Sequence, residues 1–269
     1  MRQILFSIGN IHIYGYGVMI AVGFIMGCLL LWKLAKRYGQ DPDLAVSLTL
    51  VCLISGVIGA KVLFWITVLP DFISRPLYYL RDPANGFVIY GGLIVALIFG
   101  IIFLRAKKQN APAYLDLAVA AVALGQGFGR IGCFLAGCCY GAETSGRFCV
   151  VFPENGHSPT GVPLIPTQLI MSGLDFLHCI GLCLFLAKAK NRSDGQTLGL
   201  YFICYSIGRF LIEFVRGDAE RGHVGPLSTS QFIAIFMLAF GLIMFFGAKK
   251  FFGRHSAAAV EAEEGSSED

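Results

Sequence analysis

Long apolar stretches alternate with short polar connections along the whole chain. An apolar stretch of about 20 residues is long enough to cross a bilayer as a helix. Stretches close to that length cover residues 14–32, 44–69, 87–104, 115–135, 169–187, 198–215 and 229–247. The pattern predicts an all-α polytopic membrane protein with seven transmembrane helices.

The composition excludes a water-soluble domain. Charged residues make up 14% of the 269 residues and the mean hydropathy is +0.69, whereas soluble domains carry about 25% charged residues. The first stretch is not a signal peptide, because no basic run precedes it, no small-residue cleavage site follows it, and six more stretches come after it.

Basic residues gather after every second stretch, which predicts the orientation. By the positive-inside rule these connections are cytoplasmic, so the N-terminus lies outside and the C-terminus in the cytoplasm. Residues 1–255 are then one membrane-embedded seven-helix domain with an outer loop at 136–166, and residues 256–269 form an acidic disordered tail. The basic residues concerned are Lys33, Lys36, Arg37, Arg105, Lys107, Lys108, Lys188, Lys190, Arg192, Lys249, Lys250 and Arg254.

Arg130 is the most informative residue, because it ends an apolar run in the sequence GQGFGRIGCFLAGCCYG. A charge within the membrane costs about 2.5 to 3.5 kcal/mol on insertion scales, so such an arginine points to function. Glycines at positions 125, 127, 129 and 132 allow other helices or a ligand to approach the backbone. We expect an anion beside Arg130.

Further polar residues fall in the same outer layer of the predicted bundle. Arg209, Glu213 and Arg216 are spaced i, i+4 and i+7 and so predict one helical stripe. Glu213 could simply neutralise the arginines in a structural network. Arg130, Arg209 and Lys61 nevertheless outnumber it, and a planar guanidinium suits a phosphate, so a phospholipid headgroup is the expected anion. The remaining members of the layer are Tyr14, Tyr16, Tyr90, Gly91, Gly92, Gln168, Ser228 and Gln231.

The outer connection at 136–166 is rich in glycine and proline and too long for a simple turn, so we expect a lid or binding region. Nearby, Cys133, Cys138 and Cys139 could form a metal site or redox pair, but neither a four-ligand zinc spacing nor a CxxC is present. We predict no metal and no cofactor.

Two other patterns carry less weight. The string GFGRIG fits GxGxxG, but no strand precedes it, so a dinucleotide site is not expected. Asp175 and His178, at i and i+3, fit either a proton relay or a polar pair facing the bundle interior.

The motifs resemble those of a known family. GRIGCFLAGCCYG is similar to the GRIGNFINGELYG signature of the prolipoprotein diacylglyceryl transferases. Other matches follow in order, and together they cover nearly the whole chain except the acidic tail. They are SIGNIHIYGYGVM, GAKVLF, IYGGLI, PTQL, GRFLIEFVRGD and STSQ.

The resemblance implies transfer of the diacylglyceryl group of phosphatidylglycerol to the lipobox cysteine thiol of a prolipoprotein, which forms a thioether and releases glycerol phosphate. The implied partners are this lipid, prolipoprotein signal peptides and the bacterial cytoplasmic membrane, with no nucleic acid. Because a free thiol has a pKa of about 8.5, a positive field would help it ionise and would also stabilise the leaving phosphate.

The resemblance also implies the site residues. Arg130 and Arg209 would hold the phosphate, Glu213 would orient Arg209, and Tyr90 would stand where the family often has a histidine base. The expected catalytic residues are Arg130, Arg209, Glu213 and Tyr90. The expected substrate-binding residues are Arg130, Tyr16, Lys61, Gly141, Gly91, Gly92, Cys133, Gln168 and Arg216.

Several positions depart from the family pattern, and they leave the proton acceptor open. Tyr90 has an unperturbed pKa of about 10 and is a poor base, while His157 and His223 in outer connections are alternatives. Cys133, Cys138 and Cys139 replace Asn, Glu and Leu of the signature. Two other functions stay open: a related transferase with a different acceptor, and a non-catalytic lipid carrier or transporter.

Overall fold

The computed structural model describes residues 4–8, 11–81, 86–154, 158–189, 191–218 and 222–252. Within these ranges seven helices are long and apolar enough to cross a membrane, which confirms the predicted class. The chain is a multi-pass membrane protein. The seven helices are α1 (Gly15–Arg37), α2 (Pro42–Thr67), α5 (Ile89–Ala106), α6 (Ala111–Ala136), α7 (Thr167–Lys188), α8 (Gln196–Ile212) and α9 (Thr229–Phe252). The acidic tail at 256–269 lies outside the described residues, so its disorder stays a prediction.

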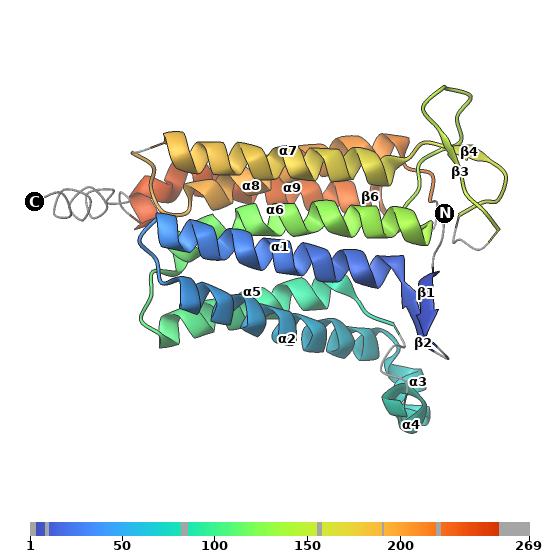
Figure 1. Ribbon diagram of the computed structural model, residues 1–269, viewed down its shortest axis with the longest axis horizontal. Helices are drawn as coiled ribbons and strands as arrows, with labels where there is room; N and C mark the ends of the chain where they lie inside the picture. The colour runs from blue at the N-terminus through green and yellow to red at the C-terminus, as the bar shows by residue number, and fades with distance from the viewer. Residues whose placement is uncertain are drawn as a thin grey trace, which may run out of the picture. The chain divides into compact units, whose positions relative to one another are not determined.

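The chain divides into two compact units. The first joins residues up to Gly39 with those from Pro112 onward and contains α1, α6, α7, α8 and α9. The second spans Gln40–Ala111 and contains α2 and α5. Figure 1 shows the long helices of the first unit running alongside one another.

Helix α6 contacts its neighbours through small residues. A Cβ atom added to Gly127 would come within 2.5 Å of the Phe176 ring of α7, and one added to Gly23 of α1 would come within 3.1 Å of the carbonyl oxygen of Gly125. Close backbone approach at small residues is how membrane helices associate. The predicted role of the glycines on this helix is therefore confirmed at Gly125 and Gly127.

In the second unit α2 and α5 cross at paired glycines. Gly91 and Gly92 of α5 lie against the carbonyl oxygens of Gly59 and Gly56 of α2. Between the two helices the chain forms two short helices that the hydropathy pattern did not predict, α3 (Leu69–Ser74) and α4 (Pro76–Arg81).

The described strands make up three small antiparallel ribbons. The hairpin before α1 was not predicted, because the hydropathy pattern was used only to find stretches long enough to span a membrane. Its strands are β1 (Ile4–Ile8) and β2 (Ile11–Tyr14). The others are β3 (Val150–Val151) with β4 (Pro163–Leu164), and β5 (His223–Val224) with β6 (Leu227–Ser228).

A buried carboxylate on α6 caps the start of α8. Asp116 is 2% exposed, and its two oxygens accept hydrogen bonds from the backbone N–H groups of Gly195 at 2.9 Å and Leu198 at 2.8 Å. The first N–H groups of a helix have no partner inside the helix, so this side chain satisfies two of them. The cap therefore ties α8 to α6 at the end of the bundle opposite Arg130.

We expect Asp116→Ala to lower the free energy of unfolding by about 2 to 4 kcal/mol, because two buried N–H groups lose their acceptor. Asp116→Asn keeps one acceptor oxygen and should lose less. Thermal unfolding in detergent measures the effect, with Asp43→Ala at the exposed start of α2 as the control. Equal stability of Asp116→Ala and the control would contradict this role of the cap.

Candidate active site

Arg130 lies in the last two turns of α6 and is half-buried. Among the described residues it has no hydrogen-bond or ion-pair partner, although Arg209 and Arg216 each pair with a carboxylate. A cation taken partly out of water without a counter-ion is costly. Arg130 is therefore available to an anionic ligand.

Arg209 of α8 is held by two other elements. Its Nη1 donates to Glu213 at 2.5 Å, and its Nη2 donates to the hydroxyl oxygen of Ser230, at the start of α9, at 2.6 Å. The carboxylate and the hydroxyl fix the plane of the guanidinium. The expected orienting role of Glu213 agrees with this geometry, whereas Ser230 was not singled out from the sequence.

The predicted stripe of Arg209, Glu213 and Arg216 is wrong at its last member. α8 ends at Ile212, and a 3₁₀ turn, η1 (Glu213–Val215), follows. Arg216 then has an extended backbone, with φ −82° and ψ 141°. Its guanidinium turns to Asp218, with contacts of 3.0 and 2.8 Å. The i+7 spacing fails because the helix stops before reaching this residue.

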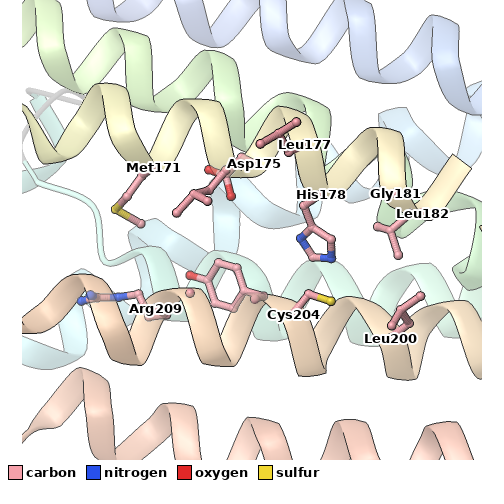
Figure 2. Close-up of a pocket in the computed structure, with 12 residues that line it drawn as sticks. Met171, Asp175, Leu177, His178, Gly181, Leu182, Leu200, Cys204 and Arg209 are labelled. Carbon is pink, nitrogen blue, oxygen red and sulfur yellow. The ribbon is translucent and has the colours of Figure 1, made fainter. Parts of the chain in front are cut away.

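A cavity of about 370 Å³ lies between α7 and α8, a size typical of small-molecule sites. Figure 2 shows Arg209 and Met171 near one end, Asp175 farther along α7, and Leu182 and Leu200 near the other end. The cavity therefore offers a cation at one end and apolar walls at the other.

Arg130 belongs to the same neighbourhood as this cavity. It lies within electrostatic range of Asp175 and Tyr205, both of which line the cavity with Arg209. Arg130 of α6 and Arg209 of α8 thus share neighbours along this cavity. That both cations grip one anion stays a prediction.

Asp175 and His178 both line the cavity, and no hydrogen bond joins them in the described structure. The His178 ring stacks on Tyr201 with centroids 5.1 Å apart, and its buried Nε2 has no partner there. This geometry gives the pair no direct relay, and Asp175 lies within electrostatic range of Arg130 instead.

The predicted outer loop is tied to the rest of the first unit through Gly141. Its N–H donates to the carbonyl of Ile165 at 2.9 Å, and it pairs with Arg216 in an antiparallel bridge. A Cβ atom at Gly141 would come within 2.6 Å of the Ile165 carbonyl oxygen. Gly141 is thus required by packing, and its contact with a substrate stays a prediction.

Two residues at the start of α7 hold the turn that follows α6. Gln168 Nε2 donates to the carbonyl of Cys138 at 2.7 Å, and Thr167 Oγ1 donates to the carbonyl of Cys139 at 2.8 Å. Both side chains are fully buried. Gln168 therefore positions the turn through its amide nitrogen, and its expected contact with the substrate is untested.

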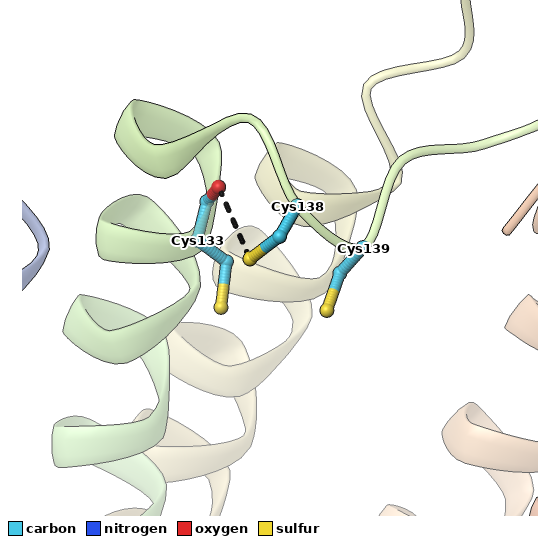
Figure 3. A group of neighbouring side chains, drawn as sticks. All are labelled: Cys133, Cys138 and Cys139. Carbon is cyan, nitrogen blue, oxygen red and sulfur yellow. Dashed lines mark hydrogen bonds between the residues drawn. The ribbon is translucent and has the colours of Figure 1, made fainter. Parts of the chain in front are cut away.

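The turn brings three cysteine thiols together beside Arg130. The sulfur atoms of Cys133, Cys138 and Cys139 lie within 4.8 Å of one another. Figure 3 shows the three side chains grouped at this turn. Hydrogen bonds from Cys133 and Cys138 hold the pKa of the Cys139 thiol below its usual range, and the positive charges of Arg216 and Arg130 lower it further. The C-x4-C-C spacing matched no motif, because the sequence did not show that the chain reverses at Gly137.

Tyr16 of α1 lies close to this turn. Its ring packs against Gly132, where an added Cβ would come within 3.1 Å of the ring carbon Cδ2. The side chain is 46% exposed and lies within electrostatic range of Arg130 and the three thiols. The structure thus brings Tyr16, Arg130 and Cys133 together, as the sequence predicts.

The other expected residues, Lys61, Tyr90, Gly91 and Gly92, belong to the second unit. Lys61 Nζ lies over the rings of Phe87 at 4.9 Å and Phe64 at 5.3 Å. Tyr90 is 47% exposed in the first turn of α5. Their part in the site stays a prediction.

Comparison with known proteins gives the family. The model of the family described as prolipoprotein diacylglyceryl transferase matches residues 3–247. The chain belongs to this family. It is 46% identical over 246 residues to a phosphatidylglycerol–prolipoprotein diacylglyceryl transferase 2 of Clostridium perfringens, covering 91% of this chain and 94% of that protein.

Two further relatives carry the same kind of name. A phosphatidylglycerol–prolipoprotein diacylglyceryl transferase of Clostridium tetani is 42% identical over 91% of this chain and 97% of its own. One of Dehalococcoides mccartyi is 34% identical over 90% and 92%. The prolipoprotein diacylglyceryl transferase family is thus matched along nearly the whole chain, as the motifs predicted, and the protein is a transferase.

In this member of the prolipoprotein diacylglyceryl transferase family, Gly91 also has a packing role that can be separated from ligand binding. We expect Gly91→Ala to lower the free energy of unfolding by about 1 to 3 kcal/mol, because the new methyl overlaps the Gly59 carbonyl and the Leu63 side chain. Thermal unfolding is the measurement. Gly173→Ala, with open space around its added Cβ, is the control. Unchanged stability together with lost lipid binding would favour a pure binding role.

Proposed function

We propose that this chain transfers the diacylglyceryl group of phosphatidylglycerol to the lipobox cysteine thiol of a prolipoprotein. The reaction forms a thioether and releases glycerol phosphate. The names of the relatives support both substrates. The observation that carries the proposal is the guanidinium of Arg130, half-buried and in no direct ion pair among the described residues.

The cavity suits a lipid with an anionic headgroup. The phosphate is bound between Arg130 and Arg209, and an acyl chain extends along the apolar walls toward Leu182 and Leu200. Both arginines stabilise the charge that grows on the phosphate as the carbon–oxygen bond breaks. Glu213 and Ser230 keep Arg209 oriented for this purpose.

The site opens to the outer face of the bacterial cytoplasmic membrane. The basic residues of the alternate connections support this orientation through the positive-inside rule. The prolipoprotein signal peptide then presents its lipobox cysteine at the end of the bundle that carries Arg130 and the outer loop at 136–166.

The function is tested with the purified protein, a lipobox peptide and phosphatidylglycerol vesicles. Mass spectrometry should show the peptide gaining one diacylglyceryl group while glycerol phosphate appears in equal amount. Lipid movement between vesicles without either product would indicate a carrier, and glycerol phosphate release only with another acceptor would indicate a related transferase.

In that assay we expect Arg130→Ala to reduce transfer by about 100- to 1,000-fold, the loss typical for one donor to a developing oxyanion. Arg209→Lys should restore little of the activity lost in Arg209→Ala, because an ammonium lacks the planar fork. Arg147→Ala, an exposed arginine of the outer loop, is the control. Normal turnover in Arg130→Ala would refute the assignment.

Ser230→Ala tests whether the hydroxyl positions Arg209. We expect Ser230→Ala to lower kcat by about two- to tenfold, the effect of one lost hydrogen bond. Ser230→Thr should keep most of the activity, because it keeps the hydroxyl. Ser206→Ala is the matched control, because the Ser206 hydroxyl is buried on α8 and has no partner in the described structure. A purely structural role of Ser230 would lower stability and leave kcat unchanged.

A further inference from the structure

Three thiols are gathered at the end of α6 by the path of the backbone. Cys133 lies in the last turns of the helix, and the N–H of Cys138 donates to its carbonyl at 3.1 Å. Gly137 and Cys139 have positive φ angles of 71° and 61°. The left-handed region is uncommon for a residue other than glycine. These two residues turn the chain back, so that Cys138 and Cys139 face Cys133.

The turn is held from outside the cluster. Gln168 and Thr167 of α7 bind the carbonyls of Cys138 and Cys139, and both side chains are fully buried. The sulfur positions are therefore set by the protein backbone and its neighbours. A site held in this way is preorganised for a ligand.

The spacing of the sulfur atoms fits a soft metal ion. Thiolates bind zinc at about 2.3 Å, which puts tetrahedral ligands about 3.8 Å apart. The sulfur atoms of the cluster lie within 4.8 Å of one another, so shifts of about 1 Å close the site. Thiolate ligands select zinc, copper(I) and other soft ions.

We propose that Cys133, Cys138 and Cys139 bind one zinc ion, and that the fourth position of the ion takes the acceptor thiol of the prolipoprotein. The second part rests on the proposed function. Zinc sites with three protein ligands leave one position for water or substrate. This inference departs from the sequence prediction of no metal.

The ion would take over the task of the histidine base, which this chain lacks relative to the family pattern. Tyr90 stands in place of the histidine base, whereas a thiol that coordinates zinc loses its proton outright. The proton passes to water when the thiol binds. The sulfur electron pair then forms the bond to the glyceryl carbon, and the carbon–oxygen bond electrons leave with the phosphate.

The position of the cluster suits this reaction. Arg130 lies one helical turn before Cys133 and within electrostatic range of Cys139. A phosphate on Arg130 and a thiolate on the ion would therefore approach from adjacent turns of α6. Arg130 and Arg216 also compensate the negative charge of the thiolates, although Arg216 is shared with Asp218.

Cobalt(II) substitution tests the site directly. The full-length protein in phosphatidylcholine vesicles, which hold no donor lipid, is titrated with cobalt(II) alone. We expect about one ion per chain and a sulfur-to-cobalt charge-transfer band, since cobalt takes the same ligands as zinc. A lipobox peptide should shift the band, and the same peptide with serine in place of cysteine should not.

Variants separate the cluster from the other cysteines. Cys133→Ser and Cys139→Ser should each abolish the band, and Cys149→Ser, a half-buried thiol of the outer loop, should leave it intact. The triple change Cys133→Asn, Cys138→Glu and Cys139→Leu restores the family pattern. It keeps the test informative if a serine variant fails to fold.

The outcomes distinguish the two proposals. No cobalt band in the folded protein overturns the metal site, and diacylglyceryl transfer in the same preparation would leave the proposed function standing. A band that the cysteine peptide does not shift overturns the role of the ion in holding the acceptor. A peptide-dependent shift without transfer after phosphatidylglycerol is added supports the thiol site and counts against the transferase reaction.

Discussion

The structure depends on a positive charge at the end of an apolar helix, which forms no direct ion pair with the residues that the structure describes. Arg209 and Arg216 have carboxylate partners, but in the described structure Arg130 has none. A carboxylate in direct contact with Arg130 would reduce the cost of burying the charge, but it would also compete with a phosphate. Arg130 can therefore bind an anion, but burying its charge lowers the stability of the fold. Packing elsewhere must offset that cost.

That compensation lies in how closely the helices approach. Gly125 and Gly127 bring α6 against α1 and α7, while Gly199 and Gly241 do the same for α8 and α9. Small residues give membrane helices extensive van der Waals contact. The Asp116 cap fixes the far end of α6 to α8. Arg130 and Arg209 are thus carried on helices that have little freedom to separate.

Much of this could be predicted from the sequence, because hydropathy reports directly on burial in a membrane. The seven helices, the close approach at Gly127 and the pairing of Arg209 with Glu213 follow from spacing alone. Arg216 could not be placed, since nothing in the local sequence showed that α8 stops at Ile212. The thiol cluster depends on the chain reversal at Gly137 and on contacts from Gln168, some 30 residues later.

The most direct test of the central claim is a solid-state NMR measurement of the coupling between arginine carbon-13 and lipid phosphorus-31. One equivalent of phosphatidylglycerol is bound to the protein in phosphate-free detergent. A direct guanidinium–phosphate contact puts the two nuclei about 4 Å apart. We predict coupled signals from two arginines, of which one disappears in Arg130→Ala and both persist in Arg147→Ala. Loss of neither signal in Arg130→Ala, or no coupling with lipid bound, would contradict the account.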